Sequence, residues 1–502
     1  MRVIEIAVVA AYLGTLSLLA LYGCHRYYLL ILHRRGRLRP PRPAGRLEPL
    51  PAITVQLPIY NEIYVVERVI GAVCGLDYPP DRLEIQVLDD SDDETSRIAG
   101  AMVARMRRLG HDIVHVRRGG RDGFKAGALA HGLRLARGEF IALFDADFVP
   151  EPGLLRDMIH HFSHPRVGMV QARWDHLNRD YSLLTRLQSI FLDGHFVIEH
   201  AARHAAARFF NFNGTAGIWR RSCIESAGGW EGDTLTEDLD LSYRAQLRGW
   251  QFVFLPDVVV PAEIPADLEA FRSQQRRWAR GSIQTARKIL PRILRARLPL
   301  AVKLEAVVHL TANGACAPMV ALALLMVPAM AIRRGAGPVV LLLVDLPLFL
   351  LSTLSVSAFY LSSQRSVGRN RSATLRLLPL LMTLGIGLSL NNARAVLGAL
   401  SGRDSAFVRT PKHHLLGTRG DWRGKRYRGA GASGWTAIEV LFAVYFAAAS
   451  VVALRQGQYA SLPFLLLFLG GFLTASLLSI ARILAGSGPS AKKHLDAELP
   501  AS

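Results

Sequence analysis

The segment Phe140-Ile141-Ala142-Leu143-Phe144-Asp145-Ala146-Asp147 decides the fold predicted for this chain. Its first five residues are apolar, which is typical of a short buried strand, and two carboxylates follow at once. The same order recurs at 84–88, which precede Asp89 and Asp90, and further strand patterns cover 53–57 and 113–116. Helical patterns at 63–73, 95–109 and 125–137 separate these strands. Such alternation predicts an α/β domain with a mainly parallel, Rossmann-like sheet.

Both acidic clusters follow predicted strands, and ligands of parallel sheets bind beyond the carboxyl ends of strands. Asp145 and Asp147 can hold a divalent ion that also contacts a diphosphate. Two aspartates at this spacing, taken without other evidence, more often form part of an acidic turn. Asp89 and Asp90 can bind a base or ribose, or they can serve as turn and helix-cap residues. Lys125 follows a glycine-rich turn at a helix start, where it is either an anion site or a surface lysine.

Two later segments carry further polar signals. Thr236, Glu237 and Asp238 begin a predicted helix that runs to Gly249. Thr236 suits the N-cap and the acids suit the helix dipole, whereas a functional interpretation makes one acid a general base. Gln274, Arg277 and Trp278 lie in the basic amphipathic segment 267–290. They indicate a membrane-interface anchor, a platform for a sugar ring, or both.

The composition indicates a membrane protein rather than a nucleic-acid-binding one. The chain has 502 residues, half of them apolar, and a formal charge of +20. A basic excess can serve nucleic acid, anionic lipid or sugar phosphates, but these basic residues cluster beside apolar runs, which favours lipid. The four cysteines are scattered, without metal-site or disulfide spacing, and this suits a reducing compartment.

Five apolar runs are long enough to cross ~30 Å of hydrocarbon: 3–23, 306–332, 338–361, 434–454 and 460–483. Basic residues follow the first run, so it is expected to be a retained anchor with the next domain in the cytoplasm. Leu377–Leu390 is shorter and is expected to be interfacial or re-entrant. With five spans the basic loop 401–433 and the tail are cytoplasmic; six spans are the alternative, against the positive-inside rule.

The predicted organisation has five parts. They are an N-terminal anchor (1–32), a cytoplasmic α/β domain (45–265), interfacial amphipathic helices (266–300), a multi-pass transmembrane region (301–485) that contains the cytoplasmic loop 401–433, and a cytoplasmic tail (486–502).

The motifs, taken in order, resemble the processive membrane glycosyltransferases of family 2, such as the cellulose, chitin, mannan and hyaluronan synthases. The likeness is greatest to the plant cellulose-synthase-like A group of mannan and glucomannan synthases and their bacterial relatives. It rests on VLDDSDDET (87–95), GFKAGAL (123–129), FDADF (144–148), VQARW (170–174), FNGTAGIWR (212–220), TEDLDLSYRAQLRGW (236–250) and QQRRW (274–278). FVRTPK (407–412) is similar to the gating loop of cellulose synthase, with Arg409 and Pro411 as departures.

The resemblance implies a GT-A fold and a role for each motif. Asp238 would be the general base, and Mg²⁺ or Mn²⁺ would bind Asp145 and Asp147. The donor nucleotide would contact Tyr60, Glu62, Asp89, Asp90, Lys125 and Asp145. The acceptor would contact Asn213, Gly214, Thr215, Glu237, Gln274, Arg277 and Trp278. The gating-like loop would act through Phe407, Thr410 and Lys412.

The function expected from this resemblance is inverting transfer of a hexose from GDP-mannose or UDP-glucose to a growing β-glycan that is exported through the plasma (inner) membrane. The alternative is a non-processive enzyme that makes a glycolipid, for example by glucosylating diacylglycerol. An inactive transporter or scaffold is a third possibility, which the intact acidic set disfavours. The expected partners are the donor, a glycan or glycolipid acceptor, the bilayer, and accessory export subunits or further copies of the chain.

Overall fold

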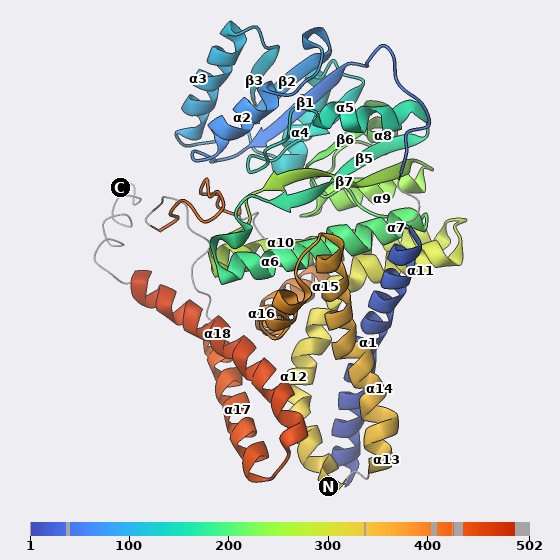
Figure 1. Ribbon diagram of the computed structural model, residues 1–502, viewed down its shortest axis with the longest axis vertical. Coiled ribbons are helices and arrows are strands. Elements are labelled where there is room, and N and C mark those ends of the chain that lie inside the picture. Colours follow the sequence, from blue (N-terminus) through green and yellow to red (C-terminus); the bar gives the residue numbers. More distant parts are fainter. Residues whose placement is uncertain are drawn as a thin grey trace.

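The computed structural model describes residues 2–36, 41–335, 338–402, 409–423, 425 and 435–486. An α/β domain lies above a set of long apolar helices, and α10 (Leu268–Arg295) runs along the junction between them (Figure 1). This arrangement agrees with the uneven distribution of apolar residues along the sequence.

A seven-stranded sheet forms the centre of the α/β domain, in the order β3-β2-β1-β4-β6-β5-β7. The first four strands are parallel to one another, and only β6 runs antiparallel to its neighbours. The strands are β1 (Ile53–Ile59), β2 (Leu83–Asp89), β3 (Ile113–Arg117), β4 (Phe140–Leu143), β5 (Val167–His176), β6 (Gly217–Arg220) and β7 (Gln251–Ala262). The predicted mainly parallel sheet and its first four strands are therefore confirmed.

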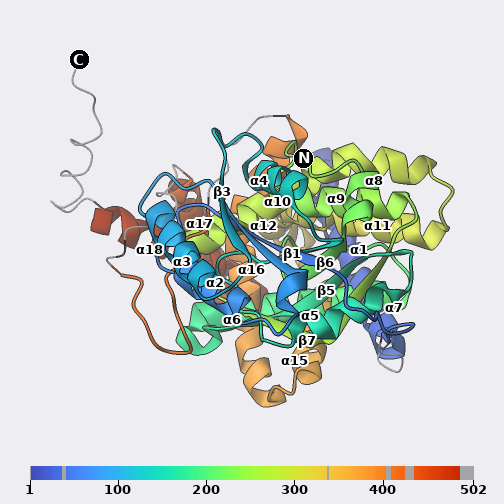
Figure 2. The same ribbon diagram turned by 90° about the horizontal axis from the view of Figure 1, so that it is seen from above.

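Helices cover both faces of the sheet (Figure 2). Alternate residues of a strand point to opposite faces, so Phe140 and Ala142 join one apolar core while Ile141 and Leu143 join the other. The first core packs on α2 (Val66–Cys74), α3 (Thr95–Arg108) and α5 (Leu154–Ile159). The second packs on α4 (Phe124–Leu135), α8 (Arg221–Ser226) and α9 (Glu237–Leu247). Burial on both faces explains why these strands are continuous apolar runs.

Six helical segments are long and apolar enough to cross a membrane: Val3–Gly36, Leu300–Gly335, Leu342–Ser366, Arg371–Leu400, Thr436–Arg455 and Tyr459–Ala481. Their α-helices are α1 (Arg2–Gly36), α11 (Leu300–Thr311), α12 (Cys316–Ile332), α14 (Leu346–Phe349), α15 (Ser355–Ser366), α16 (Arg371–Leu400), α17 (Thr436–Arg455) and α18 (Leu462–Gly486). These segments mark the chain as a membrane protein, and five of them coincide with the predicted spans.

The sixth segment, α16, contains the short apolar run Leu377–Leu390 and extends beyond it at both ends. Asn391, which directly follows the run, is part of the helix, and its side-chain oxygen accepts hydrogen bonds from Arg276 of α10 at 2.7 and 3.0 Å. Leu381 packs with α6 (Leu183–Asp193), and the carbonyl of Ala399 accepts from Arg287 of α10. Both parts of α16 therefore contact elements at the base of the α/β domain, and in Figure 1 it lies directly beneath them. The interfacial placement of the run remains a prediction.

Buried charges join the first membrane helix to the α/β domain. Glu305 of α11 accepts hydrogen bonds from His25 of α1 and from Arg203 of α7 (Ala201–Ala205), each at 2.9 Å. The side chains of Arg203 and Glu305 are 2% and 1% exposed. A buried carboxylate is stable only when its lone pairs are bonded, so this pair fixes α1 and α11 against the domain.

Candidate active site

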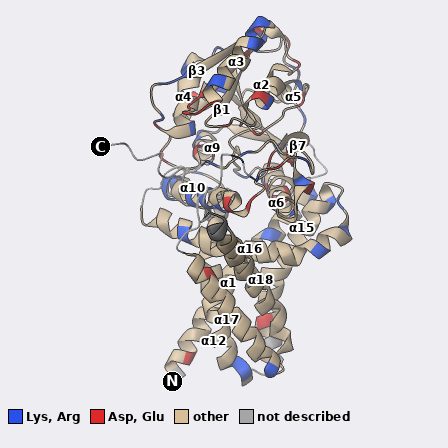
Figure 3. Ribbon diagram, turned by 90° about the vertical axis from the view of Figure 1, so that its left-hand side faces the viewer, with Lys and Arg blue, Asp and Glu red and all other residues tan. Residues whose placement is uncertain are grey.

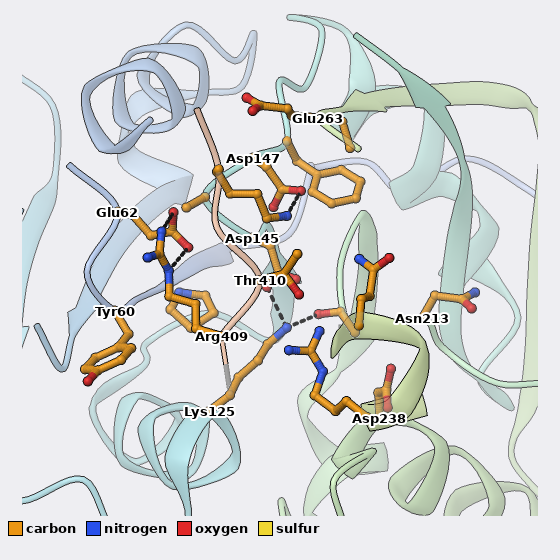
Figure 4. Close-up of a pocket in the computed structure, with 18 of the residues that line it drawn as sticks. Tyr60, Glu62, Lys125, Asp145, Asp147, Asn213, Asp238, Glu263, Arg409 and Thr410 are labelled. Atoms are coloured by element: carbon orange, nitrogen blue, oxygen red, sulfur yellow. Dashed lines mark hydrogen bonds and ion pairs between the residues drawn. The ribbon is translucent and has the colours of Figure 1, made fainter. Parts of the chain in front are cut away.

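A cleft of roughly 1300 Å³, open solvent at its mouth included, lies beyond the carboxyl ends of β1, β2 and β4. The sheet forms one wall, α9 and α10 form the opposite side, and the segment 409–412 crosses the opening (Figure 4). Most of the predicted site residues line it: Tyr60, Glu62, Asp90, Lys125, Asp145, Asp147, Asn213, Gly214, Glu237, Asp238, Gln274, Arg277, Trp278, Thr410 and Lys412. Phe407 lies outside the described residues.

Asp89 and Thr215 do not line this cleft, although the resemblance implies that they contact the substrates. Asp89 is buried and bonds His115 at 2.9 Å and the backbone N–H of Ser91 at 2.9 Å. Burial alone would raise the pKa of Asp89, but these bonds outweigh it and lower the pKa to about 2. Thr215 accepts a hydrogen bond from the backbone N–H of Asp145. Both side chains therefore support the walls of the cleft.

The proposed metal ligands are paired with two lysines. The Nζ atom of Lys125 lies 2.5 Å from Asp145 and donates also to the carbonyl of Gly214 at 2.9 Å. Burial opposes the charge on Lys125, but the carboxylates of Asp145 and Glu237 outweigh it and raise its pKa. Lys412 contacts Asp147. Each of these two aspartates is therefore already paired with a positively charged side chain.

Two carboxylates at a strand end fit a divalent ion of the magnesium type. Such ions prefer oxygen ligands, and they commonly use one or two carboxylates together with substrate phosphates. Among the described residues, the one group of three or more ligating side chains is Glu231, Asp233 and Asp240. Lys288 lies 2.5–3.1 Å from all three, and Arg244 pairs with Glu231 and Asp240, so this group already has two cationic partners. Asp145 and Asp147 line the cleft, whereas these three residues do not, so the two aspartates are the better match to a metal held with a diphosphate.

Asp238 lies at the first turn of α9 and faces the cleft beside Gly214. Burial and the neighbouring Glu237 raise the pKa of Asp238 to about 7, against the lowering influence of Lys125. Gly214 has φ +81°, which favours glycine, and a Cβ there would lie 3.0 Å from an oxygen of Asp238, so a larger residue would also crowd this carboxylate. A carboxyl group with a pKa near neutrality is suited to general base chemistry.

Thr236 does not cap α9 as the sequence predicts. No side-chain hydrogen bond caps this helix, and the Thr236 hydroxyl instead lies 3.2 Å from that of Thr285 on α10. Gly281 of α10 leaves the space for Thr236, because a Cβ there would lie 2.5 Å from its methyl group. This contact sets the first turn of α9, and hence Asp238, against α10.

The side of the cleft that the resemblance assigns to the acceptor is formed by α10 and by the segment 213–214. Gln274, Arg277 and Trp278 project from α10 into the cleft, where Trp278 is partly exposed. The side chain of Asn213 points away from Asp238 (Figure 4). Its amide atoms lie 2.9 Å from His195 and 2.8 Å from His200, both on a π-helical segment, Gly194–His200. Asn213 therefore fixes the backbone at Gly214 and does not present its amide to the cleft.

The segment 409–415 is held over the cleft by two carboxylates. Arg409 donates to both oxygens of Glu62, at 2.7 and 3.0 Å. Burial raises the pKa of Glu62, although Arg409 opposes that rise. Glu263, which follows β7, accepts from the backbone N–H groups of His413 and Leu415 at 2.6 and 3.1 Å. Thr410 and Lys412 consequently enter the cleft opposite Asp145 and Asp147.

Comparison with known proteins agrees with this geometry. Residues 51–281 match the family model described as glycosyltransferase like family 2. They form a family 2 glycosyltransferase domain. The matched region contains β1 to β7 and the Gln274–Trp278 motif, so it includes residues from both sides of the cleft.

Individual relatives agree with the family assignment. The domain is 46% identical over 250 residues to glucomannan 4-beta-mannosyltransferase 2 of Arabidopsis thaliana, covering 49% of this chain and 47% of that protein. It is 44% identical over 250 residues to glucomannan 4-beta-mannosyltransferase 1 of Oryza sativa subsp. japonica, covering 49% and 48%. The chain spans about half the length of the curated relatives it matches.

A solved structure shares the fold. It is a mannosyltransferase of Pyrobaculum calidifontis in complex with GDP-Man and Mn²⁺. The match has a TM-score of 0.52 at 23% identity and covers 80% of this chain and 99% of that one. At this identity the likeness establishes the GT-A type of fold, which the resemblance also implies.

Sequence reasoning overlooks three residues of the glycosyltransferase domain. Glu263 carries the same signal as Asp145, a carboxylate directly after an apolar strand, and this signal could have identified it. Arg121, whose guanidinium lies 3.2 Å from the centre of the Tyr60 ring, and Arg118, which pairs with Asp90, lie in a basic loop without a distinctive pattern. Arg118 and Arg121 can be identified as site residues only from the folded position of this loop beside the cleft.

Proposed function

We propose that this chain transfers a hexose from a nucleotide sugar to a growing β-linked glycan and feeds the product into the membrane. Mannose is the hexose we favour. The observation that carries the proposal is the position of Asp238, which lies in one cleft between the Lys125–Asp145 pair and the Arg277–Trp278 side of α10. The relatives are named as glucomannan 4-beta-mannosyltransferases, which supports mannose, with GDP-mannose as donor and UDP-glucose as the second candidate.

The donor half of the reaction uses the residues beyond β1, β2 and β4. Lys125 would bind a diphosphate oxygen, because an ammonium group at a helix N-terminus favours anions. Asp145 and Asp147 would hold Mg²⁺ or Mn²⁺ together with the diphosphate, and the ion would neutralise the charge of the leaving nucleotide. Tyr60 and Arg121 offer a flat surface against which a base can stack.

The acceptor half uses Asp238 as the base. Trp278 would stack on the terminal sugar ring, while Gln274 and Arg277 would bond its hydroxyls. Asp238 would then remove the proton of the attacking hydroxyl as the new glycosidic bond forms and the bond to the diphosphate breaks. A single displacement with one base inverts the configuration, so an α-linked donor yields a β-linked product.

Donor binding requires the segment 409–412 to move. Lys412 contacts Asp147 and Arg409 bonds Glu62, so both cations stand where a metal ion and donor would bind. When the donor binds, the metal ion would replace Lys412 at Asp147 and the donor would replace Arg409 at Glu62. Donor binding would in this way be coupled to movement of the loop. This supports a gating role for Thr410 and Lys412.

The proposed location is the plasma (inner) membrane with the catalytic domain in the cytoplasm, where nucleotide sugars are made. Basic residues gather on α10 at the junction with the membrane helices (Figure 3), which favours contact with anionic headgroups. The set of membrane helices in one chain is small, so accessory export subunits or further copies would complete a pore.

Donor screening tests the proposal. Membranes that contain the protein are incubated with labelled GDP-mannose or UDP-glucose and Mn²⁺ or Mg²⁺, and the product is digested with linkage-specific glycanases. A product released by endo-β-1,4-mannanase is expected. A lipid-extractable mono- or disaccharide as the only product would instead establish the glycolipid alternative, and loss of label transfer in every condition would refute both.

A further inference from the structure

Asn213, at the edge of the cleft, is held by two histidines of the π-helical segment Gly194–His200. Its amide atoms lie 2.9 Å from Nε2 of His195 and 2.8 Å from Nε2 of His200. Side chains five residues apart do not face each other on an α-helix, whereas a π-helix joins residues i and i+5. The ring centres of the two histidines are accordingly only 4.4 Å apart. The π turn is therefore what brings both imidazole rings to Asn213.

The residue that follows Asn213 contacts side chains on both sides of the cleft. The carbonyl of Gly214 accepts a hydrogen bond from Nζ of Lys125 at 2.9 Å. On its other side, a Cβ at this glycine would lie 3.0 Å from a carboxylate oxygen of Asp238. A glycine has no side chain that could fix its own position, so the contacts of its neighbours do so. The bonds of Asn213 therefore help to place a backbone segment that lies against Lys125 and Asp238.

The π-helical segment rests on helices that qualify as membrane spans. Ile198 shares one buried apolar cluster with Leu29 of α1 and Phe359 of α15. Gly194 allows a close approach of α15, because a Cβ there would lie 2.7 Å from the ring of Tyr360. In Figure 1, α7, which continues this segment, meets the upper end of α1. Two membrane helices therefore fix the segment in place.

A line of charged contacts also runs from His195 to the membrane helices. Nδ1 of His195 lies 3.1 Å from Glu199, and Arg203 donates to the same carboxylate at 3.1 Å. Arg203 donates in addition to Glu305 of α11, which bonds His25 of α1, each at 2.9 Å. Removing one partner of a buried ion pair is costly, so the line is expected to stay closed in the folded protein. It connects α1 and α11 to the imidazole of His195.

We infer that His195 is a positioning residue for the transfer step, which sets the segment Asn213–Gly214 against the base Asp238 and is itself held by the membrane helices. This inference rests on the proposed function. His195 does not line the cleft, so it acts through this segment. Its loss should slow transfer more than it weakens nucleotide binding, because Lys125 keeps its other partner, Asp145, at 2.5 Å.

The test compares two replacements of His195 in the purified full-length protein, assayed with labelled GDP-mannose and Mn²⁺. Glutamine can bond the Asn213 amide through its N–H or its carbonyl, whereas leucine can do neither. We expect His195→Leu to lower turnover at saturating donor by roughly 10–10²-fold, the cost of a misplaced group, with GDP affinity within about twofold of the wild type. His195→Gln should recover most of the lost turnover.

A double-mutant cycle tests the link to the membrane helices. His25→Leu removes one partner of Glu305, so it should lower turnover in the wild type. It should cause no further loss in the His195→Leu background, because both changes act on one line of contacts. His164→Leu is the matched control, since His164 is exposed and does not line the cleft. It should change neither turnover nor GDP affinity.

Equal turnover of His195→Leu and the wild type would overturn the inference, and so would an equal loss in His195→Leu and His195→Gln. A loss of GDP affinity as large as the loss of turnover would also overturn it, because His195 would then support the whole cleft rather than the transfer step. Full additivity of His25→Leu with His195→Leu would refute the link to the membrane helices.

Two further outcomes are kept distinct from these. If the wild type transfers no sugar from GDP-mannose or UDP-glucose, the proposed function itself fails, whatever the variants do. If His195→Leu does not fold, Glu199→Gln takes its place, because it removes the carboxylate that holds the other side of the imidazole. Glu199→Gln should then lower turnover with GDP affinity retained, and unchanged turnover would overturn the inference.

Discussion

Asp238 owes its expected basicity to its surroundings rather than to its residue type. Burial and the adjacent Glu237 raise its pKa to about 7, while Lys125 limits the rise. The sequence predicts an acid at this helix start but cannot distinguish a base from a dipole-compensating residue. That distinction depends on α10 and on Gly214, which fold against Asp238 from distant parts of the chain.

Replacement of this carboxylate tests its role. We expect Asp238→Asn to lower the rate of glycosyl transfer by roughly 10²–10⁴-fold, the usual contribution of a general base. Nucleotide binding should be retained. The measurement is turnover of labelled donor by purified protein, with Asp157→Asn on the exposed surface of α5 as the control. Unchanged transfer by Asp238→Asn would contradict the assignment.

The raised pKa also makes activity and stability depend on pH. The rate should rise as pH increases through about 7, because only the carboxylate accepts a proton. In the unfolded chain Asp238 returns to its ordinary pKa of 3.8, so deprotonation opposes folding, beginning above that value and reaching its full extent above about 7. Asp238→Asn should therefore unfold at a higher temperature than the wild type at pH 8 and at a similar temperature at pH 4. An equal difference at both pH values would contradict this explanation.

Other residue assignments show where pattern alone fails. Lys125, Asp145 and Asp147 are predicted from their positions at strand and helix ends, and the structure brings them together. Asp89 has the same strand-end signal as Asp90, but alternation along the strand turns it toward His115 and away from the cleft. One residue of register therefore separates a buried support from a cleft residue.

Among the elements, the parallel strands follow the sequence closely because burial on both faces produces apolar runs. The segment 409–415 is different. Its placement depends on Glu62 and Glu263, which lie more than 140 positions away, and no local periodicity reveals such contacts. The start of α9 likewise depends on Thr285 and not on the cap that Thr236 would favour.

Lys412 should compete with the metal ion for Asp147. We expect Lys412→Gln to lower the Mn²⁺ concentration that gives half-maximal nucleotide binding, because no ammonium group then has to leave the carboxylate. Arg105→Gln, on the exposed part of α3, should have no effect. Titration of nucleotide binding with Mn²⁺ measures the change. An increase in the required Mn²⁺ would mean that Lys412 helps to hold the donor instead.

For the whole molecule, length and composition alone leave the topology open. Six segments qualify as spans, yet α16 contacts α6 and α10 at the base of the glycosyltransferase domain. The positive-inside rule favours five spans because the basic loop 401–433 then stays beside that domain. These long-range contacts are invisible in any sequence window.

Cysteine labelling in sealed vesicles distinguishes the two topologies. Single cysteines at Arg369 and Gly402 flank α16, and one at Gln458 lies between α17 and α18, all in a variant that lacks Cys24, the one native cysteine exposed among the described residues. With five spans, positions 369 and 402 react from the same side and position 458 from the other. Reaction of 369 and 402 from opposite sides would establish six spans.

The most direct test of the central claim uses the purified protein in sealed proteoliposomes with GDP-[¹⁴C]mannose and Mn²⁺ at the side of the catalytic domain. We expect a labelled polymer that endo-β-1,4-mannanase degrades only after the vesicles are opened, and we expect that Asp238→Asn does not form it. Label confined to a lipid extract, or polymer that remains fully exposed to the enzyme, would contradict coupled synthesis and export.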